Sequence, residues 1–213
     1  MLRVLVTVFV LQFVSSCRKE AMFSLSKNNA DKVVAILPLS IYNDDELLSI
    51  KQEVSDYFHV HVIILQQQKM PQSFESNYEE TFSADSILSF LSNMAKDSVV
   101  EVIGITHKNI YVNDELKMKT NGAYKKLPFQ KDIFGLGYVY GNACIISDYR
   151  LTSQNEDLLN NRIRKAVFHE IGHNLGLKHC SNDSCLMSEL NGNITVLNKP
   201  GGDFCERCKQ KLR

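Results

Sequence analysis

Residues 169–179 read HEIGHNLGLKH, and the spacing of the polar residues in this segment points to a specific chemistry. His169 and His173 are four residues apart, so on an α-helix both imidazoles project from one face and can bind one zinc ion. Glu170 lies next to that face, where its carboxylate can reach a water molecule on the metal. Gly176 lets the helix end in a sharp turn, because glycine adopts left-handed backbone angles without steric cost. This turn returns His179 to the metal as a third ligand.

Three protein ligands leave the fourth position of zinc open for water, which is the arrangement of a catalytic site. The segment therefore predicts a catalytic zinc site in which Glu170 can reach the water bound to the metal. One alternative is a surface helix that carries three histidines by chance. Another is a related protein that binds zinc but has lost its activity. Glu170 argues against the second alternative, because an inactive protein could lose this residue without losing a ligand.

Four cysteines follow the third histidine in two short pairs, Cys180 with Cys185 and Cys205 with Cys208. Both the short pairs and the C-x-x-C spacing of the second pair are common in four-cysteine zinc sites. Two disulfides would also satisfy the pattern, and the choice depends on the compartment. We favour a structural zinc, because C-x-x-C disulfides close a very small loop and are more often redox-active than structural. The remaining cysteine of the apolar run at 143–146, Cys144, is expected to be a buried hydrophobic residue.

The segment from His169 to Cys208, with Met187 between the cysteine pairs, resembles the archaemetzincin family of zinc metalloproteases. A weaker resemblance reaches upstream through residues 104–106, 134–135 and 141–151. The resemblance implies a peptide or protein substrate and two zinc ions, one catalytic and one structural. It further implies the following roles: catalytic zinc ligands His169, His173 and His179; general base Glu170; an apolar floor beneath the metal, the Met-turn, at Met187; structural zinc ligands Cys180, Cys185, Cys205 and Cys208.

Upstream of the motif, apolar runs alternate with amphipathic segments. We expect buried strands at 33–39, 59–65 and 99–106, separated by a helix capped by Asn43 and a helix at 83–96. This order predicts a mostly parallel sheet with crossover helices. Asn155 is the expected start of the catalytic helix, and a short helix near 204–212 is expected to end the chain. Together with the resemblance, the pattern predicts an α/β (α+β) metzincin-like fold: a twisted mixed sheet with an antiparallel edge strand, a long zinc-binding active-site helix, and a four-cysteine zinc knot in the C-terminal part.

Residues 138–147 are our candidate for the edge strand that pairs with an extended peptide substrate. We expect its two pieces near 137–140 and 143–147. Gly135, Gly137 and Gly141 either allow a close approach of two backbones or are turn residues. The lysine-rich segment 109–131 is expected to be a solvated loop, with a cleft rim that prefers acidic peptides as the alternative. His107, just before it, is not expected to be a metal ligand.

The N-terminus resembles a bacterial signal peptide that ends in a lipobox. Residues 2–14 are nearly all apolar but too few to span a bilayer, and residues 14–17 read VSSC. In this interpretation 1–17 is a signal peptide, Cys17 becomes the lipidated first residue, 18–32 is a polar tether, and 33–213 is the metzincin-like zinc protease domain. The protein would then lie in the bacterial cell envelope. The alternative is a cytoplasmic protein whose first residues form a buried strand or helix.

The composition fits one globular domain behind such an anchor. Hydrophobic residues make up 44% of the chain, charged residues 23%, and the formal net charge is +0. Without a basic surplus we expect no nucleic-acid partner, and membrane contact only through the N-terminal lipid. We expect a monomer. The competing class of function is a non-catalytic zinc-binding or peptide-binding lipoprotein that retains the protease fold.

Overall fold

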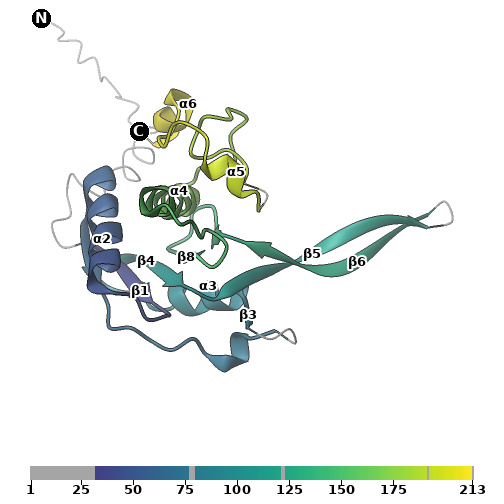
Figure 1. Ribbon diagram of the computed structural model, residues 1–213, viewed down its shortest axis with the longest axis horizontal. Coiled ribbons are helices and arrows are strands. Elements are labelled where there is room, and N and C mark those ends of the chain that lie inside the picture. Colours follow the sequence, from purple (N-terminus) through teal and green to yellow (C-terminus); the bar gives the residue numbers. More distant parts are fainter. Residues whose placement is uncertain (1–31, 77–79, 121–122, 191, 213) are drawn as a thin grey trace, which may run out of the picture.

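The protein is described here by a computed structural model that covers residues 32–76, 80–120, 123–190 and 192–212. Its centre is a five-stranded mixed sheet of strand order β2-β1-β4-β8-β7 (Figure 1). The first four strands are parallel, and the edge strand β7 runs antiparallel to β8. The strands span β1 Val33–Pro38, β2 His61–Ile64, β4 Val99–Thr106, β7 Gly135–Gly137 and β8 Ala143–Ser147. This is the mixed sheet with an antiparallel edge that the sequence predicts.

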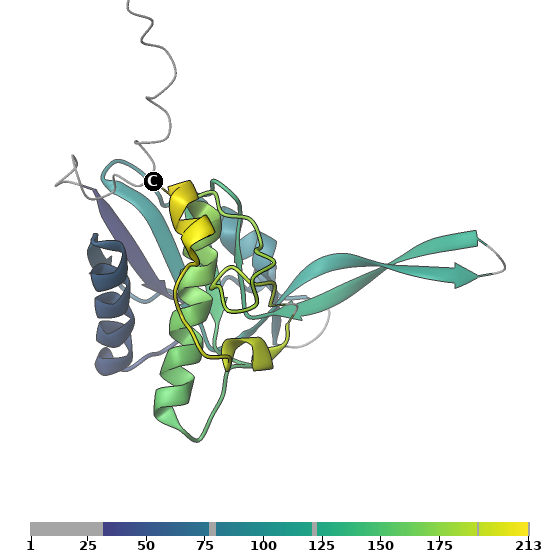
Figure 2. The same cartoon turned by 90° about the horizontal axis from the view of Figure 1, so that it is seen from above.

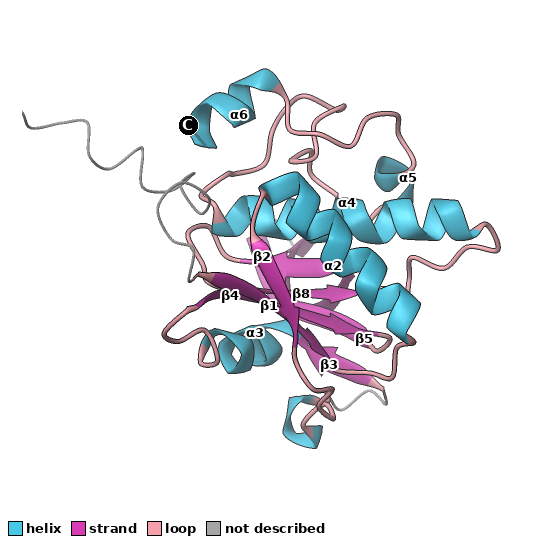
Figure 3. Cartoon of the chain, turned by 90° about the vertical axis from the view of Figure 1, so that its left-hand side faces the viewer, coloured by secondary structure: helices cyan, strands magenta, loops and turns pink. Residues whose placement is uncertain are grey.

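Helices cover both faces of this sheet, as Figure 3 shows. α2 (Asp44–Phe58) and the long α4 (Glu156–Asn174) pack on one face, and α3 (Ala84–Ser92) packs on the other. Because both faces are covered, β1, β4 and β8 are buried along nearly their whole length, and β1 reads as a continuous apolar run. The chain ends with the short helices α5 (Ile194–Leu197) and α6 (Glu206–Leu212), and a 3-10 turn, η1 (Gln72–Phe74), precedes α3.

Three helices begin directly after a capping residue. Asn43 caps α2 and forms a capping box with Glu46, and Asn155 caps α4 by accepting a hydrogen bond from the backbone N–H of Leu158. Both starts were predicted. The helix predicted at 83–96 is α3, which begins at Ala84 after the capping residue Ser83 and ends at Ser92, four residues before the predicted end. Within the described residues no helix is long and apolar enough to cross a membrane.

The predicted edge strand at 138–147 is wrong in its bounds. The edge strand is β7, three residues earlier, while Ala143–Ser147 is an interior strand that pairs with both β4 and β7. Residues 138–142 form a turn instead, in which the N–H of Gly141 donates to the carbonyl of Tyr138 and Tyr140 has a positive φ of 65°. Every position of β8 is buried, which fits an interior strand covered on both faces.

The predicted loop at 109–131 is also wrong. Residues 109–120 and 123–133 form a long antiparallel hairpin of β5 (Asn109–Thr120) and β6 (Ala123–Ile133), which projects from the body of the protein (Figures 1 and 2). Its base joins β3 (Thr81–Ser83) in a second sheet of order β3-β5-β6. In the sequence, apolar residues recur at alternate positions of this segment, but the many lysines make the pattern hard to recognise. The dipeptide Asn121-Gly122 between the two runs is a strong signal for a hairpin turn.

A buried carboxyl links the central sheet to the end of α4. Glu101 on β4 is 5% exposed and accepts a hydrogen bond of 2.9 Å from Nδ2 of Asn174. Burial raises the pKa of Glu101 to about 7, although the hydrogen bond from Asn174 acts against it. Cys144 lies beside this carboxyl and is fully buried, as the sequence predicts.

Replacing Glu101 by Gln should change how stability depends on pH. A carboxyl whose pKa is higher in the folded chain binds its proton more tightly there, so wild-type stability should fall as pH rises from about 4.5 to about 7. Glu101→Gln keeps an acceptor for Asn174 and removes the titration. Denaturant unfolding should therefore show equal stability near pH 4 and a variant more stable at pH 8, by on the order of 3 kcal/mol at most. A constant difference between the two proteins across this range would contradict the assignment.

Candidate metal centres and active site

The two histidines of the predicted zinc helix lie in the last turns of α4. His169 is 2% exposed and His173 is 9% exposed. The helix ends one residue after His173 at Asn174, and Gly176 then adopts a φ of +92°. Any other residue would be strained at this φ, and a Cβ atom there would also lie 2.2 Å from the ring of Tyr140, which would have to move. The left-handed turn predicted for Gly176 is present, and it brings His179 back toward the helix.

The three histidine rings converge on one point. Their centroids lie 4.8 Å, 5.3 Å and 4.9 Å apart, and one ligand atom from each lies within 4.8 Å of the others. Nδ1 of His169 donates to the carbonyl of Leu186 at 2.7 Å, and Nδ1 of His173 donates to the carbonyl of Leu177 at 2.8 Å. These hydrogen bonds fix the tautomer, so that Nε2 of each ring is the free ligand atom.

The electrostatics of these rings also suit a metal. Burial lowers the pKa of His169 to about 3 and lowers that of His173 as well, so both rings are neutral at physiological pH. Neutral imidazole is the form that binds zinc. His179 differs, since its side chain is 46% exposed and its Nδ1 lies 3.9 Å from a carboxylate oxygen of Glu189. His179 therefore lies on the solvent side of the cluster, and the three residues together fit one zinc ion.

Glu170 is the buried acid of the site. It is 5% exposed, and burial raises its pKa to about 8, while a hydrogen bond from the backbone N–H of Gly137 lowers it. The edge strand β7 passes very close to this residue. A Cβ atom on Gly135 would lie 2.8 Å from Cγ of Glu170, and one on Gly137 would lie 2.7 Å from its carbonyl oxygen. These two glycines therefore allow a close backbone approach, which was one of the two interpretations of the sequence.

Met187 packs against α4 beside the two helical histidines. Its side chain is fully buried, and a Cβ atom on Gly172 would come within 2.4 Å of its sulfur. The backbone carbonyl of Met187 accepts a hydrogen bond of 2.7 Å from the N–H of Cys180. The turn that carries Met187 is thus fastened both to the helix and to the first cysteine.

The histidines and Glu170 open into a cleft of about 290 Å³. One wall of this cleft is β7 with the base of the β5–β6 hairpin, and the opposite wall is the segment after Met187. The lining residues are Val112, Lys131, Ile133, Phe134, Gly135, Leu136, Gly137, His169, Glu170, His173, His179, Glu189, Leu190 and Gly192. A cleft of this size beside a strand edge can hold a short stretch of extended peptide.

The four predicted cysteines form a second cluster. Their sulfurs lie within 4.8 Å of one another, with 3.8 Å between Cys180 and Cys205 and 3.7 Å between Cys185 and Cys208. Tetrahedral zinc with bonds of about 2.3 Å places its sulfur ligands about 3.8 Å apart, whereas a disulfide requires about 2.0 Å. All four cysteines are free. The backbone N–H of Cys205 donates to the sulfur of Cys185 at 3.3 Å, a contact typical of thiolate ligands.

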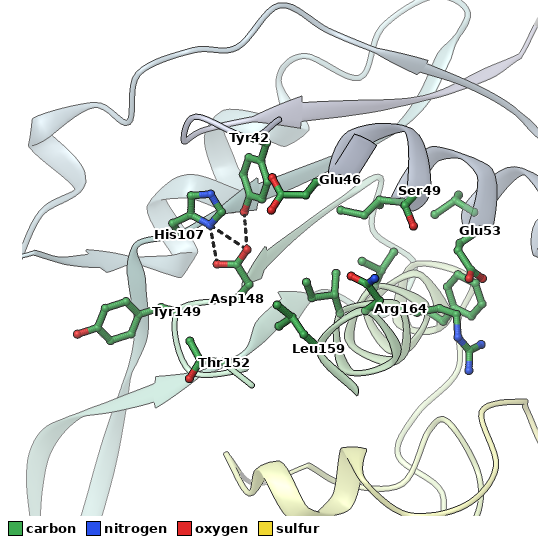
Figure 4. A pocket seen from close by; sticks show the side chains of 16 residues that line it. Tyr42, Glu46, Ser49, Glu53, His107, Asp148, Tyr149, Thr152, Leu159 and Arg164 are labelled. Carbon is green, nitrogen blue, oxygen red and sulfur yellow. Dashed lines mark hydrogen bonds and ion pairs between the residues drawn. The ribbon is translucent and has the colours of Figure 1, made fainter. Parts of the chain in front are cut away.

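A larger cavity of about 370 Å³ lies on the other side of α4, between α2 and α4 (Figure 4). At one end His107 donates from Nδ1 to Asp148 at 2.9 Å, and Tyr42 donates to the same carboxylate at 3.1 Å. His107 also contacts the carbonyl of Ile41 through Nε2 at 2.9 Å. Both ring nitrogens of His107 therefore have partners in this cavity, away from the three histidines that converge in the cleft.

Comparisons with known proteins agree with this geometry. The family model described as peptidase family M54 matches residues 37–213. A curated archaemetzincin from Halobacterium salinarum is 33% identical over 89 residues, covering 38% of this chain, so the chain spans about half, 51%, of that relative in this match. An archaemetzincin from Methanocaldococcus jannaschii is 29% identical over 84% of this chain and 92% of its own length. The crystal structure of archaemetzincin from Archaeoglobus fulgidus, complexed with malonate, superposes with a TM-score of 0.67 at 26% identity and covers 84% of this chain and 99% of that one.

The two clusters predict a metal content of two zinc ions per folded chain. His173→Ala should lose one ion while the fold persists. Cys205→Ser should lose the other ion and lower the thermal midpoint, because metal bound by a cysteine cluster contributes folding free energy. Metal content of purified protein, measured by mass spectrometry, tests this, with Cys144→Ala as the control that keeps both ions.

A thiol titration of denatured protein, in the presence of a chelator and without reductant, separates zinc from disulfides at the same cysteines. Zinc ligation predicts that all four thiols of the cluster titrate. A count lower by four would mean two disulfides and would contradict the structural zinc.

Proposed function

The chain belongs to peptidase family M54, and on this premise we propose that it is a zinc-dependent peptidase whose general base is Glu170. His169, His173 and His179 would hold the catalytic zinc. The observation that carries the proposal is the convergence of three imidazoles and one buried carboxyl in a single cleft beside the edge of a strand. A structure that only bound zinc would have no need for a buried acid next to the ligands.

Glu170 would move the proton in the reaction. Zinc, when bound, makes a water molecule easier to deprotonate and polarises the carbonyl of the bond to be cut. Glu170 takes the proton of the attacking water and later returns it to the leaving amine. Its position supports both steps, because the N–H of Gly137 holds the carboxylate and burial keeps its affinity for a proton high. Hydrolysis of the peptide bond then releases one product with a free carboxylate and one with a free amine.

Strand β7 would bind the substrate backbone. It is the terminal strand of the central sheet, its one partner among the described strands is β8, and all three of its residues line the cleft. An extended peptide can add to such an edge through main-chain hydrogen bonds, which suits substrates of many sequences. Gly135 and Gly137 support this role, since they let the edge lie against Glu170.

A second zinc at Cys180, Cys185, Cys205 and Cys208 would be structural. Its ligands join the turn after His179 to the C-terminal helix α6. The backbone hydrogen bond from the N–H of Cys180 to the carbonyl of Met187 links this cysteine cluster to the residue beneath the histidines. Met187 would then serve as the apolar floor beneath the catalytic zinc.

The cell-envelope location remains part of the proposal and rests on the sequence alone. Residues 1–17, the predicted lipidation site Cys17, and all but the last residue of the tether 18–32 lie outside the described residues. The motif VSSC after an apolar stretch supports a lipid anchor. A cytoplasmic peptidase is the alternative.

Glu170→Ala should keep the catalytic zinc but lose activity, because it removes the proton acceptor and no ligand. We expect cleavage of a diverse peptide library, followed by mass spectrometry, to fall about a hundredfold or more. Glu53→Ala, which removes an exposed carboxyl on α2 outside the cleft, is the matched control. An active Glu170→Ala protein with two zinc ions would refute the mechanism.

The anchor is tested by the intact mass of protein extracted with detergent from a bacterial host. We expect the mature chain to begin at Cys17 and to carry acyl groups, because several chains are needed for stable anchoring. Cys17→Ala should abolish the lipid. An unmodified chain that begins at Met1 would instead favour the cytoplasmic alternative.

A further inference from the structure

Tyr140 lies in the turn that follows the edge strand β7, and its backbone has an unusual conformation. Its φ of 65° falls in the left-handed region, which few residues other than glycine, asparagine and aspartate adopt. A bulky residue persists there only where the surrounding contacts require it, and such residues cluster at functional sites. Tyr140 is also 69% exposed, so burial of its ring in the core does not explain the conformation.

The turn that carries Tyr140 is fixed to the body of the protein on both sides of this residue. Before it, the hydroxyl of Tyr138 donates a hydrogen bond to the carboxylate of Asp85 on α3. After it, the carbonyl of Asn142 accepts a hydrogen bond of 3.1 Å from the N–H of Val102 on β4. The backbone of Tyr140 is therefore held in place by contacts that do not involve the zinc helix α4.

From this fixed turn, Tyr140 makes two contacts with the end of α4. Its N–H donates to the carbonyl of His173 at 3.1 Å. Its ring fills the space that a side chain at position 176 would take, because a Cβ atom on Gly176 would lie 2.2 Å from Cε1 and 2.8 Å from Cζ of the ring. Glycine at 176 thus permits both its own φ of +92° and the close approach of this ring.

The left-handed turn beneath this ring determines the positions of two of the three histidines. Leu177 belongs to the turn, and its carbonyl accepts the hydrogen bond of 2.8 Å that orients the ring of His173. His179 follows two residues later, and its side chain is 46% exposed. On the other side of His179, the chain is held by the hydrogen bond from Cys180 to Met187. A displaced turn would therefore disturb two histidines at once.

We propose that Tyr140 is a positioning residue of the metal centre. Through its N–H and its ring, it holds the turn at Gly176 in the geometry in which His173 and His179 can bind the same zinc ion. The proposal rests on the zinc site proposed above. Groups that orient metal ligands without binding the metal typically contribute about 10- to 100-fold to metal affinity. Tyr140 does not line the cleft, so its effect is on the ligands and not on the substrate.

The test replaces Tyr140 by Asn, which keeps the N–H and tolerates a positive φ but lacks the ring. Tyr140→Phe is the conservative variant, because it keeps the ring. Tyr149→Asn is the matched control, since it removes another exposed tyrosine from a loop outside the cleft. The measured quantity is the affinity of each metal site for zinc, by competition with a fluorescent chelator. His173→Ala identifies the signal of the cysteine cluster, and circular dichroism verifies the fold of each protein.

We expect Tyr140→Asn to weaken zinc binding at the histidines about tenfold or more, and Tyr140→Phe and Tyr149→Asn to change it by less than about threefold. The affinity of the cysteine cluster should stay the same in all variants. Equal affinity of the histidine site in wild type and Tyr140→Asn would overturn the proposal. So would an equal loss at both metal sites, which would indicate a general loss of structure, or a loss in Tyr140→Phe as large as in Tyr140→Asn.

Because zinc affinity is measured without a substrate, this inference is tested separately from the peptidase function. If wild type binds zinc at the histidines but cuts no peptide, and Tyr140→Asn weakens that binding, the peptidase function fails and the positioning role stands. If wild type cuts peptides and Tyr140→Asn binds zinc equally well, the positioning role fails and the peptidase function stands. A wild type that binds no zinc at the histidines would overturn both.

Discussion

The candidate active site depends on one constraint: imidazoles and a carboxyl are buried at the end of a helix, where every polar atom needs a partner. All ten residues from Lys165 to Asn174 are buried. The carbonyls of Leu177 and Leu186 accept from the two helical histidines, and the N–H of Gly137 donates to Glu170. These partners come from β7 and from the segment after the helix, so both must be held in place before the site exists.

The same constraint explains how α4 is anchored along its length. Lys165 donates to the carbonyls of Leu197 and Lys199 at 2.9 Å and 2.7 Å. Arg162 donates to the carbonyls of Leu151 and Thr152. The helix thus satisfies its buried cations with backbone oxygens of the loops before and after it. Among the described residues, no side chain of α4 forms an ion pair with the three histidines.

The sequence predicts those parts of the site where the type and spacing of the residues point to one chemical role. Three histidines and a glutamate at fixed spacing, four paired cysteines, and Asn43 and Asn155 as caps all lie where their chemistry places them. The partners at Leu177, Leu186 and Gly137 could not be foreseen, because they act through backbone atoms that carry no residue-type signal. The edge strand was misplaced because β7 reads Gly-Leu-Gly, which is too short to show the alternation of apolar and polar residues that marks a strand. The hairpin was missed because lysines at alternate positions resemble a solvated loop, and the link between Glu101 and Asn174 joins residues far apart in the chain.

The position of the cysteine cluster has a consequence for the order in which the protein assembles. The first cysteine follows the third histidine directly, and its backbone is bonded to the residue that lies beneath the helix. On the proposed zinc assignment, His169 and His173 would be in place as soon as the helix packs on the sheet, whereas His179 would wait for the four sulfurs to be gathered by their own metal. A newly made chain in a zinc-poor compartment would keep a folded scaffold with an unfinished centre. Activity would then follow the supply of metal at two successive steps, so it would rise more steeply with available zinc than the filling of a single site allows.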